Sequence, residues 1–110
     1  MWRDDIYKPS TIDRFFIEDT ALQQLILEAI IGVKGVTGLA PDFSGLLKKP
    51  IKIIRSKEKL KIKIYLLGAY GENLREVGAV VRERIIKSLE ELGGVEVERV
   101  DIIFKGVSRK

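Results

Sequence analysis

The chain has 110 residues, a formal net charge of +4, 45% hydrophobic and 33% charged side chains, and neither Cys nor His. This length fits one compact domain, and the mix of apolar and charged residues argues against a disordered tail and a membrane protein. Without Cys and His, disulfides, zinc-thiolate sites and the thiol and imidazole groups of most catalytic sites are excluded. Heavy use of Lys, Arg, Glu and Ile resembles the composition of hyperthermophile proteins.

No stretch of the sequence has the features of an export signal or a membrane-spanning helix, so we expect a cytoplasmic protein. Residues 1–13 lack any apolar periodicity and predict an irregular N-terminal arm. Residues 14–107 contain no linker or low-complexity run, and they predict a single domain.

The domain begins with a short predicted strand, Phe15–Ile17, followed by a helix. Asp19 and Thr20 supply capping oxygens for this helix, and Gln23 follows Thr20 by three positions, as in a capping box. Apolar residues then recur at helical spacing until Gly32, where the helix is expected to end.

Three strands are predicted in the middle of the chain. A brief one covers residues 36–40, and a loop runs from there to Pro50. Residues 51–55 and 60–66 are rich in β-branched side chains that mostly alternate with Lys, and the polar residues between them predict an antiparallel hairpin.

The last third predicts a helix and a strand. Asn73 is a good N-cap for a helix that runs to about Leu92, before a Gly-Gly stop. The final strand covers Val95 to about Phe104, and a change of phase along it predicts a β-bulge near Glu98-Arg99.

The predicted order is therefore β-α-β-β-β-α-β, which belongs to the α+β class. Both helices must cover apolar side chains of the same sheet. We expect a two-layer sandwich, with two helices packed on one face of a largely antiparallel sheet.

The densest charge feature lies between residues 48 and 63, where basic residues far outnumber acidic ones. Because strand side chains alternate, several of these lysines should share the open sheet face, where they predict weak, non-specific polyanion binding. The alternative is a solvated face whose lysines prevent edge-to-edge aggregation. The candidate polyanion-binding residues are Lys52, Lys59, Lys61, Lys63 and Tyr65.

The first predicted helix has a second apolar strip, formed by Leu27 and Ile31, beside the face that should meet the sheet. Either the second helix of the same chain covers this strip, or another subunit does. In the second case the protein is a homo-oligomer, and Ala79 and Ile86 on the second helix are the expected neighbours.

Two Gly-x-x-Gly segments, at residues 32–35 and 68–71, have the spacing of a phosphate-binding loop. We weigh this against helix-end geometry and close backbone packing, which glycines serve more often. The first segment has the length and the basic residue of the KH-domain loop, although a strand, not a second helix, is expected to follow it.

None of the carboxylates shows a recognisable catalytic or metal-binding pairing. Asp4-Asp5, Glu90-Glu91 and the pair Glu96 and Glu98 have the pattern of solvated charge runs. We therefore predict no enzyme activity, no catalytic residues, no metal site, no cofactor and no small-molecule substrate.

Several segments, read in order, resemble the bacterial alkaline shock protein family over roughly residues 14–107. The segments are Leu25–Ala29 leading into Gly35–Leu39, Ile64–Leu66 running into Tyr70-Gly71, Leu74–Val77, and Val100–Val107. The resemblance implies a small, non-catalytic, cytoplasmic protein linked to cell-envelope stress. It also implies association with a membrane-anchored protein, which would place the chain at the membrane through its partner, and assembly into clusters or filaments.

The leading hypothesis is thus an interaction or scaffolding module that acts by self-association and by binding a membrane-anchored partner. An alternative is a small KH-like nucleic-acid-binding module that uses the lysine-rich sheet face. A third is an enzyme subunit without an active site of its own.

Overall fold

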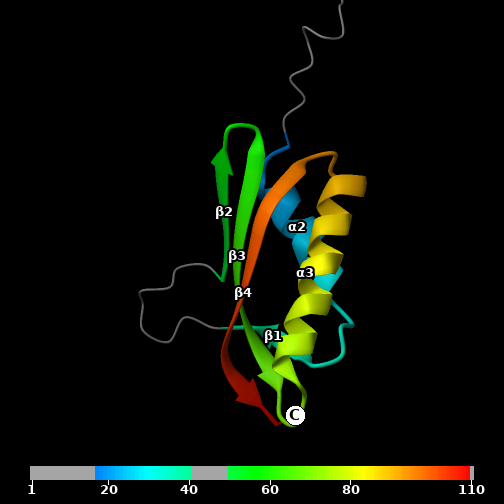
Figure 1. Ribbon diagram of the computed structural model, residues 1–110, viewed down its shortest axis with the longest axis vertical. Helices are drawn as coiled ribbons and strands as arrows, with labels where there is room; N and C mark the ends of the chain where they lie inside the picture. The colour runs from blue at the N-terminus through cyan, green and yellow to red at the C-terminus, as the bar shows by residue number, and fades with distance from the viewer. Residues whose placement is uncertain (1–16, 41–49, 110) are drawn as a thin grey trace, which may run out of the picture.

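The computed structural model describes residues 17–40 and 50–109. It is a two-layer fold in which two helices lie on one face of a four-stranded sheet (Figure 1). The elements are, in chain order, α2 (Asp19–Ile30), β1 (Val36–Leu39), β2 (Ile51–Ser56), β3 (Lys59–Ala69), α3 (Leu74–Glu91) and β4 (Glu96–Ser108).

Some predicted segments lie outside the described residues. These are the arm over residues 1–13, the loop over residues 41–49 and two residues of the predicted first strand, Phe15 and Phe16. The remaining residue of that strand, Ile17, is described and belongs to no strand.

The sheet is built around β3. β2 pairs antiparallel with the first half of β3, and β1 pairs antiparallel with its second half, so that β1 and β2 lie end to end along one edge. β4 pairs with the whole length of the other edge in parallel orientation. Two of the three pairings are antiparallel, and the predicted α+β sandwich is confirmed. The parallel pairing follows from α3, which crosses the sheet between β3 and β4.

Alternation along β3 separates the two faces of the sheet. Every second side chain from Leu60 to Leu66 points toward the helices and is at most 3% exposed. Both helices pack their apolar faces onto these side chains. The helical part of this core consists of Leu22, Ile26 and Ile30 from α2 and Val77, Val81, Ile85 and Leu89 from α3.

The predicted hairpin and the predicted bulge are both present. Lys57 and Glu58 adopt φ values of 54° and 93°, as a two-residue hairpin turn between β2 and β3 requires. The register of β4 against β3 skips Glu98, which confirms the bulge, and it skips Lys105 as well. β4 also continues four residues beyond its predicted end at Phe104.

The cap predicted for α3 is confirmed. The side-chain oxygen of Asn73 accepts hydrogen bonds from the backbone N–H groups of Arg75 and Glu76, at 3.1 and 3.3 Å. Two donors that the first helical turn cannot satisfy are thereby paired.

The cap predicted for α2 is wrong. Glu18 occupies the N-cap position without a side-chain cap bond, and Asp19 already lies in the first turn. The physical reason is a tertiary contact, because Asp19 Oδ1 accepts a hydrogen bond of 2.8 Å from the Arg55 guanidinium at the end of β2. The same guanidinium donates to the Ile17 carbonyl at 2.7 Å, and so fixes the start of α2 against the hairpin.

Gly35 allows the segment after α2 to pass close to α3. Its φ of +101° lies in the region that favours glycine, and a Cβ at this position would overlap the side chain of Val77. Gly32 also has a positive φ, +87°, but a Cβ there would meet no atom within 4 Å.

We predict that Gly35→Ala destabilises the fold more than Gly32→Ala. Both substitutions place an alanine at positive φ, which costs about 1–2 kcal/mol. Gly35→Ala adds an overlap with a buried side chain, which typically costs a further 1–3 kcal/mol, about as much as overpacking elsewhere. Urea unfolding of both variants measures the difference, and equal losses would contradict the proposed packing role of Gly35.

Candidate functional site

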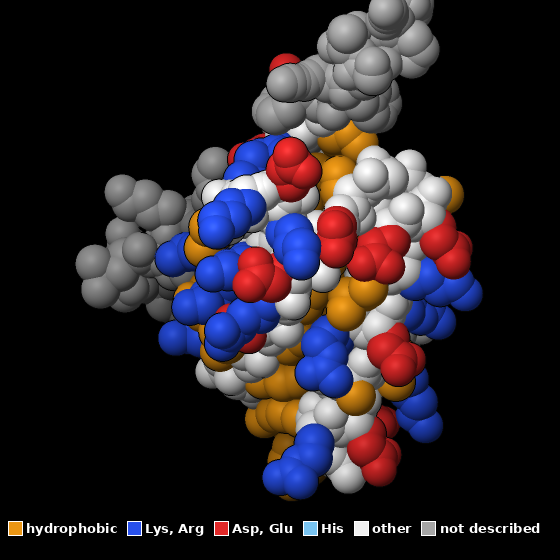
Figure 2. All heavy atoms as spheres, turned by 45° about the horizontal axis from the view of Figure 1, so that its top comes forward, with side chains coloured by type: hydrophobic (Ala, Val, Ile, Leu, Met, Phe, Trp, Pro, Cys, Tyr) orange, Lys and Arg blue, Asp and Glu red, His pale blue; other side chains and the backbone are white. Residues whose placement is uncertain are grey.

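The strongest candidate site is the sheet face opposite the helices. The structure places all five predicted polyanion-binding residues there, and β4 adds two more basic residues. Figure 2 shows Lys and Arg side chains gathered on the side of the molecule formed by the sheet. We call this surface the cationic sheet face, and it consists of Lys52, Lys59, Lys61, Lys63, Tyr65, Arg99 and Lys105.

Tyr65 forms the aromatic centre of this face. The Lys52 Nζ lies 5.8 Å from the centroid of its ring, and the Lys105 Nζ lies 6.0 Å from it. One ammonium comes from β2 and the other from β4, on opposite sides of β3. Both distances allow a cation–π attraction, which orients the two lysines beside the half-buried ring.

Positive charge on the cationic sheet face is only partly compensated. Lys59 pairs with Glu96 at 3.6 Å, and Arg99 pairs with Asp101 at 3.1 Å. Within residues 17–40 and 50–109, Lys61 and Lys63 have no carboxylate at ion-pair distance. Lys63 is also directly opposite Lys52 in the register, a like-charge pairing that destabilises a sheet. The face therefore favours an anionic ligand.

Sequence reasoning missed Arg99 and Lys105 as members of this face. The signal was present in the alternation of the last strand, where Val100, Ile102 and Phe104 point inward. Lys105 lies at a bulge of β4, and the Lys105 ammonium is above the Tyr65 ring. Strand alternation alone does not specify this position.

The four residues predicted to mediate self-association do not form one patch within the monomer. Leu27 and Ile86 are half-buried and pack against the core, whereas Ile31 is 70% exposed and Ala79 is exposed. A groove lies between α2 and α3, and Ala29 lines it from α2, so helical geometry puts Leu27 on the opposite flank of α2. Ala79 lies on the flank of α3 beside β4.

In this structure, both Gly-x-x-Gly segments allow turns with positive φ and close packing of the backbone. The first connects α2 with β1, and it buries Gly35 against Val77, as described above. In the second, a Cβ on Gly68 would lie 2.5 Å from the Leu74 side chain, and Gly71 has a φ of +90° in the turn before α3. These placements agree with the helix-end and close-packing interpretation.

Among the described residues, no group of three or more Asp or Glu side chains is placed to hold a metal ion. No helix in the described part of the chain is long and apolar enough to cross a membrane.

Comparison with models of protein families identifies the family of this chain. Residues 7–109 match the model of the alkaline shock protein family, described as having a cell envelope-related function. The chain belongs to this family. The match confirms the resemblance seen in the sequence, since it extends over nearly the whole chain.

Solved structures with a similar fold include several forms of the MamM CTD. One variant superposes with a TM-score of 0.56 at 14% identity, covering 79% of this family member and 93% of that chain. A zinc form of a second variant gives 0.52 at 14% identity, covering 79% and 84%. At this identity the likeness concerns the fold alone. A comparison with curated proteins gives no match.

We predict that the cationic sheet face binds polyanions weakly and without sequence preference. Neutralising about three phosphates gives a log–log salt slope of roughly −2 to −3, so binding should fade at physiological salt. Replacing Lys59, Lys61 and Lys63 by Ala should abolish most of it and keep the fold, because these side chains point away from the core. Lys61 and Lys63 should account for most of the loss, since Lys59 is already paired.

Heparin or oligonucleotide titration at several salt concentrations measures this effect. The matched control removes three exposed cations elsewhere, with Lys57→Ala, Arg84→Ala and Lys87→Ala combined. Equal losses in both triple variants would show that net charge, not the sheet face, determines binding.

Proposed function

We propose that this member of the alkaline shock protein family is a non-catalytic interaction module in cell-envelope homeostasis, acting by self-association and by binding a membrane-anchored partner. The observation that carries the proposal is the family match over residues 7–109. On this proposal the chain itself stays in the cytoplasm and reaches the membrane surface through its partner.

The described surface supports an interaction role in two ways. The cationic sheet face places the ammonium groups of Lys52 and Lys105 beside Tyr65, a surface suited to an anionic partner. Ile31 exposes 70% of its surface directly after α2, and a contact with a second copy would remove this apolar surface from water.

The KH-like alternative receives less support from the geometry. The Gly-x-x-Gly segment at residues 32–35 precedes β1, and Gly35 is buried against Val77, away from the cationic sheet face. Among the described residues of that face, Tyr65 is the one aromatic side chain, whereas sheets that read RNA use several for stacking.

Affinity capture from detergent-solubilised membranes, with and without nuclease, tests the partner. We expect a membrane-anchored protein to be retained after nuclease treatment. Loss of all bound material on nuclease treatment would support the KH-like alternative instead.

Self-association should depend on Ile31 more specifically than on Leu27. Ile31→Lys places a charge on an exposed position, so it should leave a folded chain of lower mass if Ile31 lies at a subunit contact. Leu27→Lys should instead lower stability, because Leu27 packs against the core and a charge buried there would be unpaired.

Light scattering and circular dichroism, measured on the same samples, separate these effects. Leu92→Lys is the matched control, since Leu92 is 73% exposed at the end of α3. A wild-type chain that is monomeric at high concentration would contradict self-association.

A further inference from the structure

The outer edge of β4 is a second unassigned surface. In the described part of the chain, β4 pairs with β3 on one side and with no strand on the other. Edge strands are usually protected by bulges or charges, and β4 has bulges at Glu98 and Lys105. Between them, residues 99–104 form an uninterrupted edge, with unpaired N–H and C=O groups at alternate residues.

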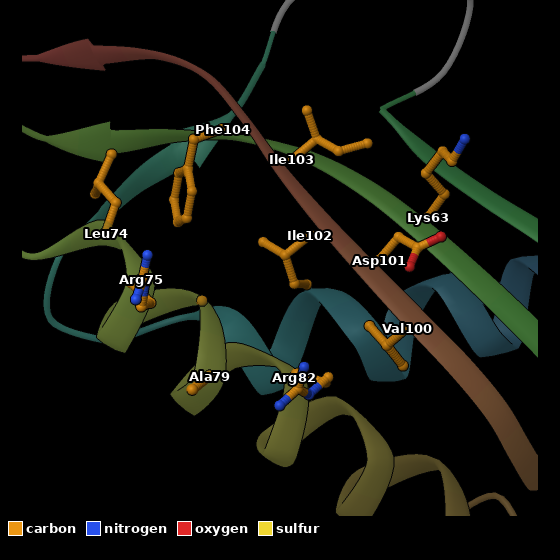
Figure 3. A pocket seen from close by; sticks show the side chains of 11 residues that line it. Lys63, Leu74, Arg75, Ala79, Arg82, Val100, Asp101, Ile102, Ile103 and Phe104 are labelled. Carbon is orange, nitrogen blue, oxygen red and sulfur yellow. The ribbon is translucent and has the colours of Figure 1, made fainter.

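A groove of about 830 Å³ runs along this edge, between β4 and the first half of α3 (Figure 3). Ile102 and Phe104 project toward α3, whereas Ile103 projects to the other side of the strand. Gly78 and Ala79 of α3 line the opposite wall, and a Cβ on Gly78 would lie 3.6 Å from the Phe104 ring, so the helix meets β4 closely at this point. An extended chain fits this shape, because it can pair with the edge and place alternate side chains in the groove.

The groove is lined mainly by positively charged side chains, which favour a negatively charged ligand. Three cations line it, Lys63, Arg75 and Arg82, against one carboxylate, Asp101. That carboxylate is already engaged by Arg99 at 3.1 Å. Neither Arg75 nor Arg82 has a carboxylate at ion-pair distance within the described residues. Arg75 and Arg82 are two helical turns apart, about 10 Å, which is the span of three to four residues of an extended chain.

A second copy of the same edge is a poor occupant. Antiparallel pairing of two β4 strands about a twofold axis would bring both α3 helices to the same side of the joined sheet. Arg75 and Arg82 would then approach the same two residues of the other copy, and like charges juxtaposed in this way disfavour the pairing.

We infer that the β4 edge, with its groove against α3, binds an acidic extended peptide segment of a partner protein by β-strand addition. The backbone of the peptide pairs with residues 100–104, its apolar side chains contact Ile102 and Phe104, and its carboxylates reach Arg75 and Arg82. This inference deepens the proposed function, since it names the recognition chemistry of the partner.

The test uses the full chain and three synthetic nine-residue peptides, measured by fluorescence polarisation. The first carries Glu and Val in turn at every second position with Thr between them, so that both kinds of side chain face the groove. The second carries Lys in place of Glu, and the third is the Glu-Val peptide with alternate backbone amides methylated. We expect binding of the first alone, together with slower hydrogen exchange at the amides of residues 100–104. Equal binding of the Lys-Val peptide, or of the methylated peptide, would overturn strand addition of an acidic segment.

Charge reversal on α3 tests the arginines. Arg75→Glu combined with Arg82→Glu should weaken binding of the Glu-Val peptide by at least about tenfold, because two favourable charge pairs become repulsive. The matched control, Arg84→Glu combined with Lys87→Glu, makes the same charge change on the flank of α3 that faces α2, and it should leave binding almost unchanged. Equal weakening in both double variants would overturn the assignment of this groove.

Capture from membranes then separates the inference from the proposed function. If the Arg75 and Arg82 double variant still captures the membrane-anchored protein as wild type does, the inference is overturned and the proposed function stands. If wild type binds the Glu-Val peptide at β4 but captures no membrane protein, the inference stands and the proposed membrane-anchored partner is overturned.

Discussion

Burial of the inward side chains of β3 beneath two helices is the interaction on which the remaining structure depends. Four of these side chains, from Leu60 to Leu66, are at most 3% exposed, and each contributes about 1.5–3 kcal/mol by leaving water. β1, β2 and β4 all pair with β3. A register slip of one residue would turn Lys61 and Lys63 into the core, so the same burial also fixes the position of every neighbouring strand.

The two interaction surfaces follow from this arrangement. Strand alternation that buries one side of β3 must place Lys59, Lys61 and Lys63 together on the other side. The crossover through α3 returns the chain to β3 in parallel and sets a helix beside the last strand, whose outer side pairs with no strand in the described part of the chain. The positions of the cationic sheet face and of the β4 groove therefore result from the topology, whereas the charge of each surface depends on its side chains.

Local signals in the sequence were enough for much of the fold and for part of the candidate site. The hairpin, the Asn73 cap, the bulge at Glu98 and the shared face of the lysines all depend on neighbours within a few residues or on strand alternation. The contact of Asp19 with Arg55 links residues far apart in sequence, and it replaced a local cap. The groove beside β4 was not predicted for the same reason, because it exists only once α3 packs beside that strand.

The cationic sheet face and the β4 groove meet at the same strand. Lys63 lines the groove and is also a member of the face, directly opposite Lys52. A strand added to β4 would extend the sheet, and its alternate side chains would join the cationic sheet face beside Asp101 and Ile103. A segment that carries carboxylates at those positions as well as in the groove would reduce the repulsion that the isolated chain leaves between its lysines. Occupation of the edge therefore changes the charge of the open face, so polyanion binding there should weaken when an acidic segment is bound.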